Sequence, residues 1–189
     1  MPTFFVRIPE DRVGVLIGPG GRTRRQIAES TRTDVEIESK EGEVQIRGPD
    51  DDPGGVLQAR DIVLAIGRGF SPARALRLLR PETYLGILDI KVTTGHHEKA
   101  ALRRIRSRVI GTRGQARARI EDLSGCFMSV YGTTVALIGT EEQLARATRA
   151  VELLLRGSEH STVFHLLARL RRDAALEAAL GPASEALEE

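Results

Sequence analysis

The stretch VLIGPGGRTRRQI, residues 15–27, decides how this chain folds, because its apolar ends keep helical spacing while three glycines and a proline separate them. Glycine and proline both disfavour the interior of a helix, so a helix must break between them. The same layout returns in VIGTRGQARARI, residues 109–120. In both stretches an isoleucine precedes Gly-x-x-Gly, and a second helical segment follows. A break that recurs in the same context predicts two copies of one structural unit.

Both breaks lie within the same predicted order of elements: strand, helix, break, helix, strand, strand, helix. This order predicts an α+β fold in which each copy has a three-stranded antiparallel sheet and three helices. In the second copy, we expect the first strand over residues 84–92 and the helix before the break over residues 96–110. Residues 127–132 and 134–139 are expected to pair as a hairpin.

The expected domains are residues 1–69 and 83–157, with a linker over residues 70–82 and a C-terminal helix with an acidic tail over residues 158–189. Ser71 and Pro72 form a helix start and Pro81 follows the end of that helix, which predicts a structured linker and a fixed orientation of the two copies. The last segment is expected to form an extra C-terminal helix. Its apolar stripe packs on the core or, alternatively, binds a partner; it comprises Val163, Leu167, Leu170 and Ala174.

The bulk properties of the 189 residues exclude several classes of protein. The single cysteine, Cys126, cannot form an intramolecular disulfide, and no stretch approaches the roughly 18 apolar residues of a membrane span. No signal peptide is recognisable at the N-terminus, so we expect a cytoplasmic protein that does not bind membranes. The net charge is only +2, but residues 99–119 hold eight basic residues and no acid. Such a patch attracts polyanions.

A glycine-rich break between two helices suits the binding of a phosphate backbone. The second helix begins with free N–H groups and the positive end of its dipole, and no β-carbon blocks the approach of a phosphate. K-homology (KH) domains have this arrangement, and their Gly-x-x-Gly loop clamps about four nucleotides of single-stranded RNA. The predicted element order resembles two tandem type I KH domains.

Enzymatic alternatives find little support in the sequence. A P-loop needs GxxxxGK[ST], and a dinucleotide fingerprint needs GxGxxG directly after a strand; neither break has either pattern. The histidines His96 and His97 are adjacent, and no cluster of ligands has metal-binding spacing. Cys126 precedes an apolar strand and is expected in the core. We therefore predict no enzymatic activity, catalytic residue, metal site or cofactor.

The two loops differ in their chemistry. Pro19 removes one backbone donor from the first loop, whereas Thr112 and Arg113 add a hydroxyl and a guanidinium to the second. We therefore expect the second copy to supply most of the RNA affinity, while the first extends the footprint or contacts another surface. The candidate RNA-binding residues are Gly18, Pro19, Gly20, Gly21, Arg22, Arg24, Arg25, Gly111, Thr112, Arg113, Gly114, Gln115 and Arg117.

Three segments resemble one family: GFSPARALRLL (residues 69–79), TYLGILDI (residues 83–90) and the region over residues 103–139. The family is that of archaeal KH proteins related to the eukaryotic partner of the Nob endonuclease, a small-subunit ribosome assembly factor. This resemblance implies binding to the 3′ region of small-subunit rRNA during pre-rRNA maturation, with a PIN-domain endonuclease of the Nob family as a partner. Eukaryotic members have a first copy without the glycine loop, whereas Gly18 and Gly21 are present here. The alternative function is a KH-fold scaffold that docks proteins and contacts RNA only incidentally.

Overall fold

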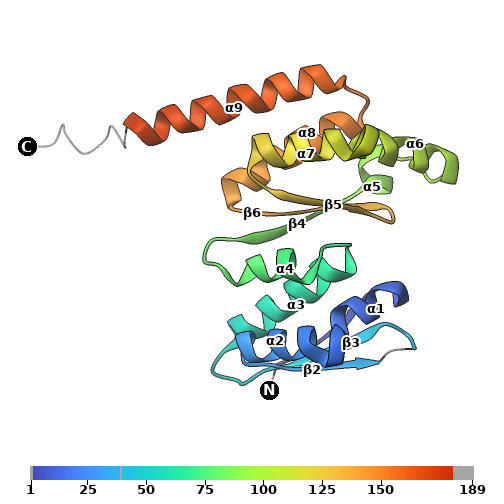
Figure 1. Ribbon diagram of the computed structural model, residues 1–189, viewed down its shortest axis with the longest axis vertical. Helices are drawn as coiled ribbons and strands as arrows, with labels where there is room; N and C mark the ends of the chain where they lie inside the picture. Colours follow the sequence, from blue (N-terminus) through green and yellow to red (C-terminus); the bar gives the residue numbers. More distant parts are fainter. Residues whose placement is uncertain (1, 39, 181–189) are drawn as a thin grey trace, which may run out of the picture.

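The first copy folds as predicted, into a three-stranded antiparallel sheet with three helices on one face (Figure 1). The computed structural model describes residues 2–38 and 40–180. The elements of this copy are β1 (Thr3–Arg7), α1 (Glu10–Ile17), a 3₁₀ turn (Pro19–Gly21), α2 (Arg22–Thr31), β2 (Asp34–Glu38), β3 (Glu43–Arg47) and α3 (Pro53–Gly67). The strands pair in the order β1-β3-β2. Buried Val44 and Ile46 alternate with polar neighbours, as expected of a sheet with one open face.

The second copy repeats this arrangement with one additional helix. Its elements are β4 (Tyr84–Asp89), α5 (Ile90–Thr94), α6 (Lys99–Ile110), a 3₁₀ turn (Thr112–Gly114), α7 (Gln115–Ser124), β5 (Phe127–Tyr131), β6 (Thr134–Gly139) and α8 (Glu141–Leu155). The strands pair in the order β4-β6-β5, and both pairings are antiparallel. The predicted hairpin is therefore confirmed as β5 and β6. The domain boundaries given above stay predictions.

Two sequence-based predictions in the second copy are wrong. The strand predicted over residues 84–92 ends at Asp89, and the helix predicted over residues 96–110 begins only at Lys99. The carboxylate of Asp89 accepts hydrogen bonds from the N–H groups of Lys91 (2.8 Å) and Val92 (3.2 Å). This N-cap starts the short helix α5 in the middle of an apolar run that reads as a strand.

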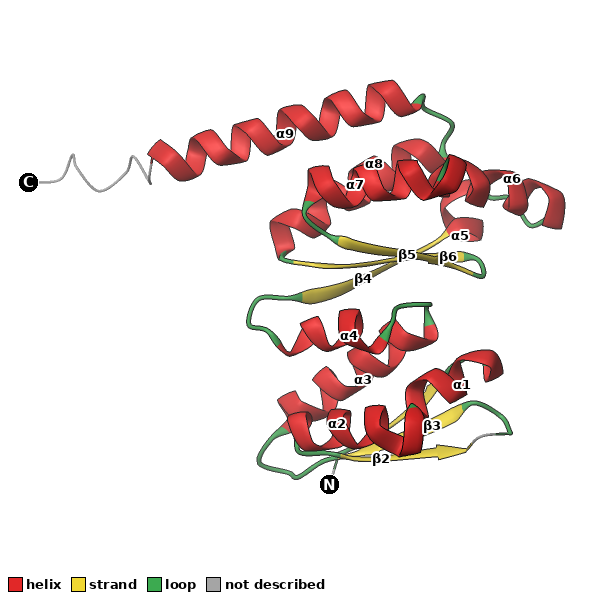
Figure 2. Ribbon diagram, in the orientation of Figure 1, coloured by secondary structure: helices red, strands yellow, loops and turns green. Residues whose placement is uncertain are grey.

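The second sheet, unlike the first, is covered on both faces. All six residues of β6 are buried. Val135 and Leu137 belong to the core under α6 to α8, whereas Ala136 and Ile138 belong to the core of the first copy. In Figure 2 the second sheet lies between its own helices and the linker helix α4 (Pro72–Ala75). A strand buried on both faces reads as a continuous apolar run, which is why TVALIG lacks the alternation of EVQIR.

Polar contacts reinforce the shared core between the two copies. The hydroxyl of Ser129 donates to the backbone oxygen of Arg68 (2.9 Å), and the guanidinium of Arg74 pairs with the carboxylate of Glu121 (2.9 Å). The Tyr131 hydroxyl donates to the Asp11 carboxylate, and this bond raises the pKa of Tyr131 above its usual range. The linker, α4 followed by a 3₁₀ turn (Leu76–Leu79), is thus structured as predicted and holds the copies in a fixed orientation.

The predicted C-terminal helix is α9 (His160–Leu180), which packs against α7 and α8. Val163 and Leu167 are fully buried in the second core, so the first half of the apolar stripe is a packing face. Toward its C-terminal end the helix is exposed: Leu180 retains 73% of its accessible surface. The predicted acidic tail, residues 181–189, lies outside the described residues. Within residues 2–38 and 40–180, no helix has the length and hydropathy needed to cross a bilayer.

Because one core joins both copies, the substitution Phe70→Ala should destabilise the whole chain. Phe70 is 1% exposed and belongs to the core that also contains Ala136 and Ile138. We expect a loss of about 3–5 kcal/mol in the free energy of unfolding, measured by urea denaturation. Phe5→Ala is the control, since Phe5 is 64% exposed and should change stability by only about 0.5 kcal/mol. Separate unfolding transitions of the two copies in the wild-type protein would contradict this prediction.

Candidate nucleic-acid interface

Each helix break begins with a glycine in a conformation that other residues do not adopt. Gly18 ends α1 with φ 70° and ψ 172°, and Gly111 ends α6 with φ 74° and ψ 172°. This region of backbone space is essentially restricted to glycine. The amide of Gly18 still donates to the Gly14 oxygen (3.0 Å), and that of Gly111 to the Ser107 oxygen (2.8 Å). The helix is therefore complete up to the glycine, and the chain then turns sharply.

Close packing gives a second reason for glycine at these two positions. A β-carbon on Gly111 would lie 2.6 Å from the β-carbon of Ala116, and one on Gly18 would lie 2.2 Å from the Thr23 hydroxyl oxygen. Both neighbours lie in the first turn of the next helix, α7 or α2. The glycine thus allows the two helices of each copy to meet at close range. The first residue of each second helix, Arg22 in α2 and Gln115 in α7, is exposed.

The last two residues of each loop have a left-handed backbone, and at the first of these two positions the first copy has glycine and the second copy has arginine. Gly20 has φ 58° and ψ 25°, and its counterpart Arg113 has φ 53° and ψ 26°. Gly21 and Gly114 follow with φ 74° and 75°. A non-glycine residue in this region costs roughly 1–2 kcal/mol. The second loop therefore carries backbone strain that the first loop avoids.

Free backbone donors distinguish the loops further. In each loop the last glycine donates to the first: Gly21 to Gly18 and Gly114 to Gly111, both over 3.1 Å. The two residues between them begin a helical turn, so their amides have no partner within it. In the second loop these are the amides of Thr112 and Arg113. In the first loop Pro19 has no amide hydrogen, which leaves one such donor.

The candidate arginines of the first loop are largely engaged within the protein. Arg25 donates to the Gly20 oxygen (2.9 Å) and Arg24 to the Val35 oxygen (3.1 Å). Arg22 and Arg25 are both exposed. In the second copy, Arg113 and Arg117 make no hydrogen bond or ion pair with any residue in the described ranges. Arg113 is exposed and Arg117 half-buried, and the side chains of Thr112 and Gln115 are exposed. The candidate residues of the second copy therefore remain available to a ligand.

A groove lies between α7 and the edge strand β5, and Arg117, three residues after the second loop, lines it. It contains a hollow of about 230 Å³ to which Arg117, Met128 and Ser129 contribute from the second copy. The other wall comes from the linker region, through Gly69, Phe70, Ser71 and Arg74. Sequence reasoning did not connect Arg74 with this groove, because only the packing of the linker onto the second sheet brings the two together.

The arginines of α6 differ in whether they are available to a ligand. Arg103, Arg104 and Arg106 are exposed on α6 and extend the positive surface away from the loop, although Arg106 also donates to the Gly132 oxygen (3.3 Å). Arg108 instead donates to the backbone oxygen of Gly157 (2.9 Å) in the turn before α9. Its role is structural, so the number of charges in the sequence overstates the number available to a polyanion.

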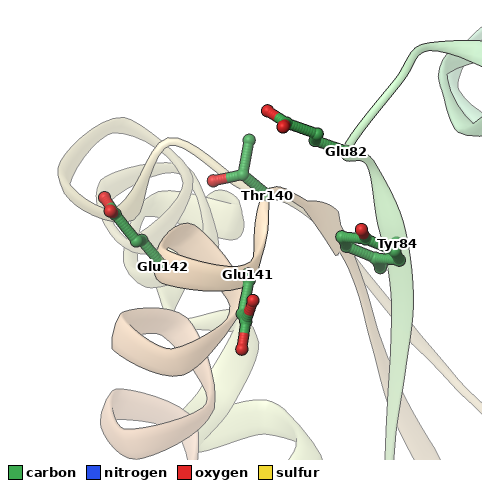
Figure 3. Close-up of a pocket in the computed structure, with 5 residues that line it drawn as sticks. All are labelled: Glu82, Tyr84, Thr140, Glu141 and Glu142. Atoms are coloured by element: carbon green, nitrogen blue, oxygen red, sulfur yellow. The ribbon is translucent and has the colours of Figure 1, made fainter.

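Carboxylates gather in two other hollows. Figure 3 shows Glu82, Tyr84, Thr140, Glu141 and Glu142 around a hollow of about 410 Å³ at the start of α8. A second hollow, of about 420 Å³ on the open face of the first sheet, includes Glu36, Glu38 and Glu43. Both would repel phosphates, which favours the loops and the basic surface of α6 as the side that faces a nucleic acid.

The single cysteine lies in the core of the second copy. Cys126 is 2% exposed, and burial raises its pKa from 9.0 to about 11, so the thiol is neutral and inert at neutral pH. This confirms its predicted place in the core. Over residues 2–38 and 40–180, no group of three or more His, Cys, Asp or Glu side chains could hold a metal ion.

Comparison with family models identifies both copies. A model of the KH domain matches residues 3–65, and a model described as the eukaryotic type KH domain (type I) matches residues 85–172. The second match extends beyond α8 into α9. Both copies are therefore KH domains.

Individual proteins resemble the chain over most of its length. A KH domain-containing protein of Methanocaldococcus jannaschii is 44% identical over 170 residues, which is 89% of this chain and 74% of that protein. The crystal structure of Dim2p from Pyrococcus horikoshii OT3 has 46% identity and a TM-score of 0.84, and covers 89% of this chain and 99% of that one. A structure of the complex of a/eIF2alpha, aDim2p and rRNA from the same organism matches with 46% identity and a TM-score of 0.85, over 91% of this chain and 95% of that one.

The first and last glycines of the second loop should respond differently to alanine. Gly114→Ala meets no atom within 4 Å and should cost only the left-handed backbone, about 1 kcal/mol. Gly111→Ala adds the clash with Ala116 and should cost about 3 kcal/mol in the free energy of unfolding. Gly95→Ala is a matched control, with φ 70° in open space. Equal losses for all three variants in urea denaturation would contradict this explanation.

Proposed function

We propose that this chain, which belongs to the archaeal Dim2-like family of tandem KH proteins, binds single-stranded RNA mainly through its second Gly-x-x-Gly loop. The proposed target is the 3′ region of small-subunit rRNA during ribosome assembly and pre-rRNA maturation. One observation carries the proposal: Arg113 stands in a strained left-handed conformation where the first copy has glycine. Strain that a simple substitution would relieve is typical of functional positions.

The geometry of the second loop suits a phosphate backbone. The free amides of Thr112 and Arg113 lie in the 3₁₀ turn directly before α7, near the end of the helix dipole that favours an anion. A β-carbon on Gly114 would meet no atom within 4 Å, so the turn is open at this residue. The guanidiniums of Arg113 and Arg117 add charge-assisted hydrogen bonds, which arginine forms readily with phosphate oxygens. These contacts hold the RNA strand in place independently of its sequence. The bases are recognised in the groove between α7 and β5.

The first loop plays a weaker part in this proposal. It has the same backbone shape, but one amide fewer and two arginines already engaged. Gly18, Pro19, Gly20, Gly21 and Arg22 would extend the footprint rather than determine the affinity. A clamp of about four nucleotides per copy, held in a fixed orientation, would cover roughly eight nucleotides in all.

The similarity to archaeal Dim2p supports the choice of rRNA, since the aDim2p complex contains rRNA. A PIN-domain endonuclease of the Nob family is the proposed protein partner, on the strength of the family resemblance. In this scheme the chain acts without catalysis and presents RNA to an enzyme.

A docking role is the second candidate, and one observation favours it. The aDim2p complex also contains a/eIF2alpha, and the open face of the first sheet presents exposed Phe5 beside carboxylates. Salt dependence separates the two functions. Binding driven by phosphates of a single strand should weaken with a log–log slope of about −0.7 per phosphate neutralised. A docking protein should bind RNA weakly at moderate salt.

Paired loop variants test the proposal. The double variant Thr112→Asp, Arg113→Asp should weaken binding of a labelled RNA with the 3′ sequence of small-subunit rRNA by about 10- to 100-fold, because a charge-assisted hydrogen bond contributes about 1.5–3 kcal/mol. Pro19→Asp, Gly20→Asp is the matched variant of the first loop and should lose about 3-fold or less, as expected of peripheral charge. Fluorescence anisotropy gives the affinities, and circular dichroism checks the fold. Equal affinity of both variants and the wild type would contradict the proposal.

A further inference from the structure

Another hollow adjoins the Gly-x-x-Gly loop of the second copy. It lies between α7 and α9, on a different side of α7 from the groove beside β5. It has a volume of about 430 Å³, within the range of small-ligand pockets. One wall comes from the loop and the first turns of α7, and the other from the first turn of α9. Its lining includes Gly111, Thr112, Gln115, Arg119, His160 and Phe164.

The two rings of this hollow are held in place by the surrounding structure. The Nε2 atom of His160 lies 2.8 Å from the backbone oxygen of Arg108, while the Arg108 guanidinium donates to the Gly157 oxygen (2.9 Å). These bonds tie the end of α6 directly to the start of α9. Val163, the residue before Phe164 in the sequence, is fully buried and anchors the first turn of α9 in the second core. The centroids of His160 and Phe164 lie 5.9 Å apart, with the ring planes inclined by 49°.

We infer that this hollow binds one nucleobase of single-stranded RNA, from a nucleotide adjacent to those whose phosphates the second loop binds. The inference rests on the function proposed above. The hollow shares Gly111 and Thr112 with the loop, so a strand that crosses the loop brings a base to its mouth. An aromatic face stacks on any base. The exposed Arg119 guanidinium, 3.4 Å from the Asp122 carboxylate, can contact either the base or the phosphate. No lining residue is acidic.

The hollow also distinguishes the two copies. After its closing helix α3, the first copy continues into the linker and toward the second sheet, whereas after α8 the second copy returns along α7 as α9. The rings of His160 and Phe164 therefore lie beside the second loop, which has more free amide donors, and the first loop has no such neighbour among the described residues. A base stacked there would lengthen the footprint of the second copy by one nucleotide.

A double-mutant cycle tests this inference. Phe164→Leu keeps an apolar side chain but removes the ring, and should weaken binding of intact RNA about 10-fold, as expected when one stacked base is lost. The nucleotides of the RNA are then made abasic one at a time. At one position next to the clamp, this change should weaken binding to the wild type about 10-fold. The same change should not weaken binding to Phe164→Leu any further. Phe164→Tyr should restore the wild-type pattern. Phe5→Leu, at an exposed ring on the first sheet, should leave it unchanged.

The possible results separate the two proposals. If the abasic penalties are the same in the wild type and in Phe164→Leu, while Thr112→Asp, Arg113→Asp still weakens binding, the hollow is not a base site and the loop clamp stands. If the wild type does not bind the RNA, both proposals are overturned. A 2-aminopurine probe at the identified position needs no variant: its fluorescence should fall on binding, and unchanged fluorescence would overturn the base site even if Phe164→Leu destabilised the protein.

Discussion

In each copy a helix ends at a glycine whose backbone other residues do not adopt, and the shape of the binding surface depends on this constraint. At Gly18 and Gly111 the chain turns so closely that the next helix begins against the glycine itself. The free amides lie in the short 3₁₀ turn between the glycine and the second helix. An alanine at either position would clash with the first turn of the next helix, so the two helices would have to move apart and the turn between them would change shape.

The two copies share this backbone but differ in what they place on it. The second loop accepts a strained arginine and keeps both free amides, whereas the first loop relaxes the strain with Gly20 and loses a donor to Pro19. Their sheets also differ in how they are covered. The second sheet is buried on both faces, so the linker and the first copy form part of its groove. The first copy thus serves as a support for the second, whatever RNA contacts it makes itself.

The repeat made much of this fold predictable from the sequence. Two matching Gly-x-x-Gly breaks indicated the type I KH order and the hairpin of β5 and β6. The sequence did not predict that the second sheet is covered on both faces, because this depends on where the linker packs. Helix α5 was missed because Ile90 and Val92 favour strands, and only the hydrogen bonds to Asp89 reveal the helix. The hollow beside α9 joins residues about 50 positions apart, which no local pattern connects.

Backbone amide NMR during titration with a short single-stranded RNA tests most directly that the second loop is the principal RNA clamp. Resonances of Thr112 to Gln115 should shift at the lowest RNA concentrations, and those of Gly20 to Arg22 should follow only at higher ones. The open face of the first sheet, around Phe5 and Gln45, should not respond. If the first loop or that open face shifts before residues 112–115, the principal RNA contact lies elsewhere and the role assigned to Arg113 is wrong.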